Sequence, residues 1–374
     1  MNSKMKSKEI ITKILESADI KINGDRSWDI KVLDERVYDR VLSQGTLGLG
    51  ESYMDNWWEC EELDEGVNKL FRFGNPAIID KNLSTLFHVL KSKTLNLQTK
   101  SRAKQVAENH YDLGNDLYTS FLDPYMQYSC GYFKNTEDLE IAQKQKMDLI
   151  CKKLDIRAGE KVLDIGCGWG GLARYMSENY GANITGITIS KEQAEYAKKF
   201  TEDFSVNIEL MDYRNLSGKF DKVVSVGMLE HVGYKNYRQI FEIVKEHIKD
   251  DGLFLLHTIG NNESATMSGT WIEKYIFPNS MLPSQKQLTS SWEGLFVMED
   301  WHNFGQYYDF TLMAWYKNFV KAWPNLKEKY GERFYRMFRF YLLSSAGLFR
   351  ARNIHLWQIV LSPKGVLGGY ESVR

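Results

Sequence analysis

The sequence predicts an α/β protein whose larger part is a doubly wound β-sheet, and three observations point to this fold. From about residue 109 onward, short apolar runs alternate with helical patterns. A glycine-rich segment joins the first of these runs to the helix that follows it. The 374 residues are also 43% hydrophobic and include only six prolines, so the chain can fill a sizeable core.

Five short runs are apolar and β-branched, which is typical of buried parallel strands. They cover residues 161–165, 183–187, 207–211, 221–226 and 252–259. Helical patterns cover residues 171–180, 191–200 and 235–249, and residues 355–362 add a late strand. This alternation predicts βαβ units and a parallel sheet.

The chain is predicted to have three parts. Residues 1–95 form a small, mainly helical domain with a glycine-rich turn at Gly45, Gly48 and Gly50. Residues 96–108 are a basic, polar linker, and residues 109–374 form the α/β domain.

The net charge of −1 conceals a strongly segregated charge pattern. Residues 41–68 contain no Lys or Arg but seven acids, whereas residues 69–107 contain eight Lys or Arg and a single acid, Asp80. Within the basic stretch, apolar residues recur at helical spacing at Leu83, Leu86, Phe87 and Leu90. This pattern fits a solvated helix on its own domain, or a surface that attracts anionic lipid or nucleic acid.

A second basic segment, residues 317–352, interleaves nine Lys or Arg with aromatic residues, as nucleic-acid binders also do. The near-neutral overall charge argues against nucleic acid as a partner. The chain has no uncharged run of the ~20 residues that a membrane span needs. Its four cysteines form no C-x-x-C pair, and the first residues lack the apolar core of a signal peptide. We expect a soluble, cytoplasmic protein.

The segment that follows the first strand, residues 162–171, reads VLDIGCGWGG. Its glycines allow a ligand to approach the backbone, and the next helix offers free N–H groups at its amino end. Gly166, Gly168 and Gly171 satisfy the dinucleotide pattern G-x-G-x-x-G, but no ribose-binding acid follows about 20 residues later. With Asp164 before the glycines, the form D-x-G-x-G resembles the S-adenosylmethionine loop of class I methyltransferases. A glycine turn without a ligand is the plainer alternative.

Polar residues after the next two strands are candidates for nucleoside contacts, because parallel strands end at one edge of the sheet. Thr188, Ser190 and Gln193 follow the second strand, and Asp212 and Tyr213 follow the third, where they are placed to meet an adenine. Each of them alone is more often a helix cap or a core residue.

Eight segments together resemble the cyclopropane-fatty-acyl-phospholipid synthases, a family related to the mycolic acid cyclopropane synthases. They are residues 111–118, 122–133, 162–171, 225–233, 254–260, 274–279, 298–305 and 349–358. The resemblance implies a Rossmann-like class I methyltransferase fold with S-adenosylmethionine as cofactor. It also implies that a methylene group is transferred to a cis double bond of an unsaturated acyl chain in a membrane phospholipid, closing a cyclopropane ring. A bound bicarbonate ion is the implied proton acceptor.

The resemblance further implies a homodimer that lies peripherally on the inner face of the membrane, with residues 1–95 as the lipid-associating domain. The resemblance implies no nucleic-acid partner.

The family's bicarbonate ligands map onto Cys130, Glu230, His257, Tyr308 and the backbone of Ile259. His257 and Tyr308 would donate hydrogen bonds to the ion, and Glu230 would accept one. The plainer readings are a buried thiol for Cys130, a structural imidazole for His257 and a core ring for Tyr308. A metal held by Cys130, Glu230 and His257 is disfavoured, because their spacing matches no zinc pattern.

The same resemblance implies a set of cofactor-binding residues. They are Tyr128, Ser129, Asp164, Gly166, Cys167, Gly168, Gly170, Thr188, Ile189, Ser190, Gln193, Asp212 and Tyr213. Aromatic rings such as those of Tyr128 and Tyr308 would also line the site for a cationic reaction.

Three alternatives stay open at this point. A related enzyme could leave a methyl-branched or methylene lipid, which product mass spectrometry would reveal. A methyltransferase for a small polar substrate would not explain the basic amphipathic stretch. A membrane-binding protein without catalytic activity would not need the D-x-G-x-G loop and would not bind S-adenosylmethionine.

Overall fold

The computed structural model describes residues 2–74 and 114–374, which divide into two compact units. Among the described residues, the first unit combines residues 2–74, 266–278 and 308–354, and the second combines residues 114–265, 279–307 and 355–374. The first unit therefore recruits two segments from the C-terminal half of the chain. The assignment of residues 1–95 to lipid association and of residues 109–374 to catalysis stays a prediction.

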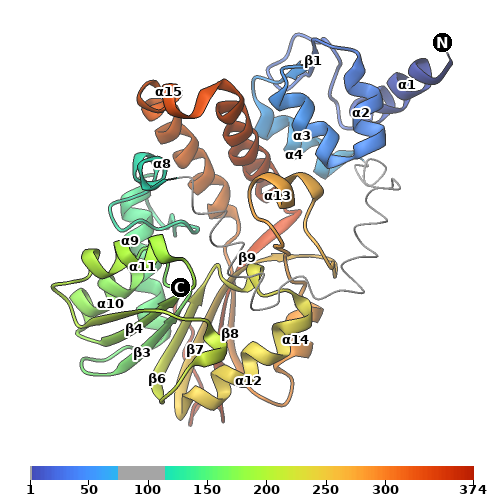
Figure 1. The fold of residues 1–374 in the computed structure, drawn as a ribbon. Coiled ribbons are helices and arrows are strands. Elements are labelled where there is room, and N and C mark those ends of the chain that lie inside the picture. The colour runs from blue at the N-terminus through green and yellow to red at the C-terminus, as the bar shows by residue number, and fades with distance from the viewer. Residues whose placement is uncertain (1, 75–113) are drawn as a thin grey trace. The chain divides into compact units, whose positions relative to one another are not determined.

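The second unit contains a seven-stranded sheet with the order β5-β4-β3-β6-β7-β9-β8 (Figure 1). Its strands are β3 (Lys161–Ile165), β4 (Asn183–Thr188), β5 (Val206–Leu210), β6 (Phe220–Val226), β7 (Ile248–Asn261), β8 (Val297–Asn303) and β9 (Ile354–Ser362). Strands β5, β4, β3, β6 and β7 pair in parallel, and β8 pairs antiparallel with β9. The strand order reverses beside β3, and ligands of such sheets bind at the carboxyl ends of the strands at this point.

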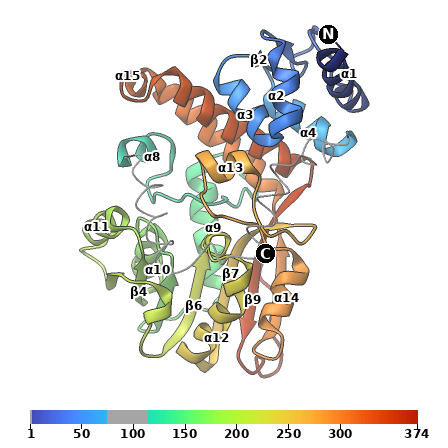
Figure 2. The ribbon, with the colours of Figure 1, turned by 45° about the vertical axis from the view of Figure 1, so that its right-hand side comes forward.

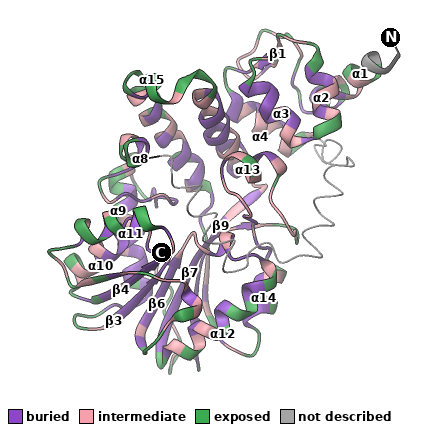
Figure 3. Cartoon of the chain, viewed as in Figure 1, coloured by how far each residue is buried: buried purple, intermediate pink, exposed green. Residues whose placement is uncertain are grey.

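Helices cover both faces of this sheet (Figures 1 and 2). The main ones are α9 (Leu139–Lys153), α10 (Gly171–Tyr180), α11 (Lys191–Phe200), α12 (Tyr237–His247) and α14 (Gln285–Trp292). Successive strand residues point to opposite faces: Leu163 packs in one core cluster with side chains of α12 and α14, and Val162 packs in another with α9 and α10. Because both faces are covered, most residues of β3, β6 and β7 are buried (Figure 3).

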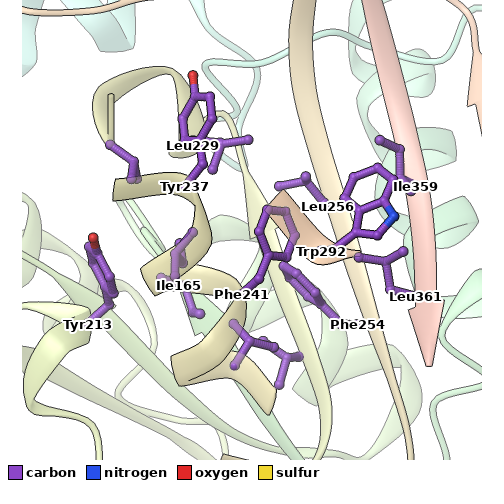
Figure 4. Close-up of a cluster of buried hydrophobic side chains, with 14 of the residues drawn as sticks. Ile165, Tyr213, Leu229, Tyr237, Phe241, Phe254, Leu256, Trp292, Ile359 and Leu361 are labelled. Carbon is purple, nitrogen blue, oxygen red and sulfur yellow. The ribbon is translucent and has the colours of Figure 1, made fainter. Parts of the chain in front are cut away.

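The cluster on the α12 face is rich in aromatic rings (Figure 4). The ring of Phe241 lies 6.2 Å from that of Phe254 and 5.5 Å from that of Trp292, both in tilted or edge-on contact. This packing fixes α12 and α14 against β7.

The predicted fold class is confirmed, and each predicted strand appears with its bounds extended or shifted by at most a few residues. The edge strand β8 was not predicted. Its sequence, VMEDWHN, is interrupted by polar residues, so the segment lacks the apolar run that marks a buried strand. Val297 and Met298 at its start are exposed.

The first unit is mainly helical, as predicted. It contains α1 (Asn2–Ser17), α2 (Arg36–Gln44), α3 (Thr46–Met54), α4 (Leu63–Phe73), α13 (Thr270–Tyr275) and most of α15 (Gln306–Arg350), with the short strands β1 (Lys31–Val32) and β2 (Trp58–Glu59). Helix α15 changes direction at Gly331, whose φ is 74°.

The expected glycine-rich turn is wrong in part. Only Gly45, with φ 61°, turns the chain between α2 and α3, whereas Gly48 and Gly50 lie inside α3. A Cβ atom on Gly48 would overlap the backbone of Arg40, and one on Gly50 would overlap the indole of Trp271. These two glycines therefore serve close packing.

The acidic run of residues 41–68 pairs with basic residues that are distant in the sequence. Arg336 pairs with Glu59, Arg350 lies 2.7 Å from Asp64, and Glu51 accepts from Lys274 at 2.6 Å. Three of the nine Lys or Arg of residues 317–352 thus pair with acids of this run: Arg333, Arg336 and Arg350.

The basic amphipathic stretch lies almost entirely outside the described residues, including Leu83, Leu86, Phe87, Leu90 and the linker 96–108. Across residues 2–74 and 114–374, no helix is both long and apolar enough to span a bilayer.

The substitution Gly50→Ala tests the packing of α3 on α13. Although Ala favours a helix by about 1 kcal/mol, the new methyl group would overlap Trp271, so we expect a net loss of about 1–3 kcal/mol in unfolding free energy. The control is Gly269→Ala, whose Cβ would lie 3.6 Å from its nearest neighbour. Because Gly269 is the N-cap of α13, where Gly is preferred to Ala, we expect this variant to lose less than about 1 kcal/mol. Denaturant unfolding measures the free energy of unfolding of both variants, and equal values for the two would contradict the packing of Gly50 against Trp271.

Candidate active site

The glycine loop leaves β3 and enters α10 through backbone with positive φ angles. Gly166, Gly168 and Gly170 have φ values of 82°, 55° and 83°, which side chains other than glycine rarely adopt. A Cβ atom on Gly168 would meet nothing within 4 Å, so open space adjoins its backbone. A Cβ on Gly171 would overlap the carbonyl of Tyr125. The loop therefore combines close internal packing with an open stretch of backbone at a helix amino end.

Asp164 and Cys167 lie at this junction, and both are buried. Burial raises the pKa of Asp164 to about 7, although the charge of Lys146 acts in the opposite direction. Its Oδ2 atom has no hydrogen-bond partner. Burial likewise raises the pKa of the Cys167 thiol well above its usual value. Asp164 thus offers an unsatisfied acceptor beside the loop.

The polar residues after β4 bind one another. The Ser190 hydroxyl caps α11 by accepting from the backbone N–H of Gln193 at 3.3 Å. The Thr188 hydroxyl donates to the side-chain carbonyl of Gln193 at 3.0 Å, and half-buried Ile189 lies between them in the chain. Nucleoside contacts by these four residues stay a prediction.

Asp212 and Tyr213 follow β5. A carboxylate oxygen of Asp212 accepts from the backbone N–H of Arg214 at 2.9 Å. The Tyr213 ring belongs to the core cluster, and its hydroxyl is buried (Figure 4). Contact with an adenine stays a prediction for both.

An aromatic cluster stands beside the loop, formed with helix α8 (Asn115–Phe121). The ring of Tyr118 lies 4.7 Å from that of Trp169 and 5.4 Å from that of Tyr128. The Trp169 indole N–H donates to the Asn115 side chain at 3.0 Å, which ties the loop to α8. Sequence reasoning proposed Tyr128 but missed Tyr118 and Trp169, although both lie in the segments that carried the family resemblance.

Glu230, the predicted hydrogen-bond acceptor, and Ile259, the predicted backbone ligand, meet at the carboxyl ends of β6 and β7. Glu230 lies in the short helix η3 (Leu229–His231), and its Oε1 atom accepts from the backbone N–H of Ile259 at 2.7 Å. Its Oε2 atom is buried without a partner. Burial raises the pKa of Glu230 to about 7, against the effects of hydrogen bonds with the Ile259 N–H group and the Thr258 hydroxyl. The backbone N–H of Ile259 is therefore engaged by Glu230 itself.

His257 lies on β7, two residues before Ile259, and is 1% exposed. Its Nδ1 atom lies 3.3 Å from the amide nitrogen of Gln358 on β9. An amide that donates to Nδ1 leaves the imidazole proton on Nε2, which is buried without a partner. Burial lowers the pKa of His257 well below its usual value, so the ring is neutral. His257 thus presents one N–H donor.

Gln358 was missed as a site residue. It is fully buried in the strand sequence HLWQIVLS, and a single amide within an apolar strand was the available signal.

Cys130 and Ser129 follow Tyr128 and are both buried, and the Ser129 hydroxyl accepts from Lys146 at 2.9 Å. Tyr308 belongs to the first unit, where its ring stacks on Phe349 at 4.5 Å. The structure joins Glu230 to Ile259 directly and leaves the grouping of all five predicted ligands a prediction. No three His, Cys, Asp or Glu side chains among the described residues lie close enough to hold a metal ion.

The sequence profile described as mycolic acid cyclopropane synthetase matches residues 98–359. The chain belongs to this family. It is 50% identical to the cyclopropane-fatty-acyl-phospholipid synthase of Escherichia coli K12, over 98% of this chain and 95% of the relative. As a member of the family it is an S-adenosylmethionine-dependent methyltransferase.

Two solved structures of the family are similar to this one. The cyclopropane synthase MmaA2 of Mycobacterium tuberculosis is 28% identical with a TM-score of 0.66, and the match covers 71% of this chain and 99% of that one. The mycolic acid cyclopropane synthase CmaA1, complexed with SAH and CTAB, is 29% identical with a TM-score of 0.64 over 69% and 97%. The chain extends beyond both matches.

The raised pKa of Glu230 makes a prediction about stability. The folded protein keeps a proton that the unfolded chain releases between pH 4.5 and about 7, so this group lowers the free energy of unfolding as the pH rises through that interval. Glu230→Gln removes the titration. Without ligands, the variant should be more stable than the parent by about 2–3 kcal/mol at pH 8 and by much less at pH 4.5.

Chemical denaturation at the two pH values measures this difference. The control is Glu242→Gln, which changes an exposed carboxyl on the neighbouring helix α12. A gain for Glu230→Gln that does not depend on pH would contradict the burial of a titrating carboxyl.

Proposed function

We propose that the enzyme transfers a methylene group from S-adenosylmethionine to a cis double bond in an unsaturated phospholipid acyl chain, forming a cyclopropane fatty acid with bicarbonate as proton acceptor. The observation that carries this proposal is the pair of buried, unpartnered polar atoms, Glu230 Oε2 and His257 Nε2, at the carboxyl edge of the sheet. The likeness of this chain to the Escherichia coli synthase over nearly its whole length supports the same reaction.

The described residues fit S-adenosylmethionine. The open backbone at Gly168 and the unpartnered Asp164 oxygen offer room and an acceptor at the loop. When bound, this cofactor supplies an electrophilic methyl group on a positively charged sulfur. Tyr118, Tyr128 and Trp169 offer ring faces that stabilise cations without acting as nucleophiles.

The two buried polar atoms Glu230 Oε2 and His257 Nε2 fit a small anion that carries one proton. His257 donates from Nε2. Glu230, whose pKa of about 7 leaves it partly ionised near neutral pH, accepts at Oε2 in its ionised form, so an ion with both an anionic oxygen and a hydroxyl satisfies both. Bicarbonate has this chemistry, and when bound it can take the proton that the transferred methyl group loses as the ring closes. Gln358 holds the imidazole and Ile259 holds the carboxylate in place. Cys130 and Tyr308 would complete the set of ligands.

Product analysis tests the reaction. We expect phospholipids with cis-unsaturated chains to gain one CH2 group and lose their alkene when incubated with enzyme and S-adenosylmethionine, and Glu230→Gln and His257→Ala to lower the rate by about 100-fold or more. Mass spectrometry with proton NMR of the ring distinguishes this product from its alternative. A gain of CH2 with a retained alkene would replace ring closure by a methyl-branched or methylene product.

The basic stretch supports a peripheral position at an anionic membrane surface, the inner face. Each Lys or Arg near such a surface contributes about 1 kcal/mol. The resemblance to the family further suggests a homodimer as the working form. Charge reversal is proposed at four lysines: Lys91, Lys93, Lys100 and Lys104. Charge reversal of four exposed lysines is the control: Lys191, Lys198, Lys199 and Lys286.

Vesicle co-sedimentation should show that the first variant binds anionic liposomes at least tenfold more weakly, while its affinity for S-adenosylmethionine stays unchanged. The control variant should bind liposomes like the parent. Equal loss in both variants would contradict a specific role of this stretch, and light scattering at a monomer mass would contradict the dimer.

A further inference from the structure

Helix α9 buries two lysines, and they have different partners. The Lys153 ammonium lies 3.3 Å from the carboxylate of Asp300, which balances its charge. Lys146 is also fully buried, but its ammonium donates to the neutral side chains of Gln127 and, at 2.9 Å, Ser129. Because burying a charge is costly unless another charge offsets it, Lys146 calls for a counter-charge.

The same helix braces the segment that carries the predicted ligands. The Gln143 amide donates to the backbone carbonyl of Ser129 at 2.8 Å, one turn before Lys146. Helix α9 thus holds both the backbone and the side chain of Ser129, which directly precedes Cys130. Lys146 is fixed in place relative to Cys130 and can act on a group bound there.

Asp123 and Asp164 interact with the charge of Lys146, but its ammonium donates its hydrogen bonds to Gln127 and Ser129. Asp123 accepts from the backbone N–H groups of Gln127 and Tyr125, at 2.8 and 2.9 Å. Asp164 has a pKa raised to about 7 by burial, so it is partly protonated near neutral pH. Burial lowers the pKa of Lys146 itself to about 8, which leaves it mostly protonated at pH 7.

The positive charge of Lys146 also acts on His257. It is one of the charges that lower the pKa of His257, after burial, and it interacts with the Cys130 thiol. The charged and titratable groups that face Lys146 are therefore Asp123, Cys130, Asp164 and His257.

We infer that Lys146 is a positioning residue whose buried ammonium, held by Gln127 and Ser129, supplies the counter-charge for the bicarbonate bound beside Cys130, Glu230 and His257. This inference rests on the proposed function, because it requires that anion. Lys146 does not touch the reacting atoms in this account. It acts by favouring an anion over water in a buried site, where charges interact more strongly than in bulk water.

Bicarbonate binding by the full-length protein with SAH bound tests the inference. Carbon-13 NMR of labelled bicarbonate and the rise in unfolding temperature both report the affinity without turnover. We expect Lys146→Met and Lys146→Gln to need roughly tenfold more bicarbonate than the parent, with SAH affinity within about twofold. The matched control is Lys144→Met on the same helix, where the exposed lysine pairs with Glu140, and it should bind both ligands like the parent.

The outcomes separate the two proposals. If the parent binds bicarbonate and both Lys146 variants bind it equally well, Lys146 is not the counter-charge and the proposed reaction stands. If both variants lose SAH and bicarbonate together, the lysine has a structural role only and the inference fails. If the parent neither binds bicarbonate nor needs it for turnover, the proposed proton acceptor fails, and this inference fails with it.

Discussion

Polar groups removed from water must find partners, and the second unit of this protein leaves several unsatisfied at one edge of its sheet. Glu230 Oε2 and His257 Nε2 are buried at the ends of β6 and β7, and Asp164 Oδ2 is buried at β3. The protein holds these groups firmly, since Ile259 and Gln358 fix two of them by hydrogen bonds. Such fixed but unsatisfied groups describe a site built for polar ligands.

The fold explains why they gather there. Parallel strands covered by helices on both faces have apolar interiors, so polar chemistry is confined to the strand ends. The glycine loop after β3 opens the backbone at the same edge, beside the aromatic cluster of Tyr118, Tyr128 and Trp169. In the first unit, by contrast, acids of residues 41–68 form ion pairs with arginines of α15.

Most of the fold could be predicted from sequence because buried parallel strands are continuous apolar runs. Strand β8 was not predicted, because this exposed edge strand has no continuous apolar run. Gly48 and Gly50 were wrongly assigned to a turn, because close packing and turning both favour glycine. Glu230 and His257 were found through family resemblance. Gln358 was missed although a single amide in an apolar strand was a signal, and Lys146 was missed because one lysine in a lysine-rich helix carries no local sign of burial.

The central claim is that the unsatisfied pair at β6 and β7 holds a bicarbonate ion. A crystal structure of the enzyme with SAH and bicarbonate tests it most directly. The account predicts planar, three-oxygen density within about 3 Å of both Glu230 Oε2 and His257 Nε2. Density for water alone at saturating bicarbonate, or a direct contact between the two side chains, would contradict it.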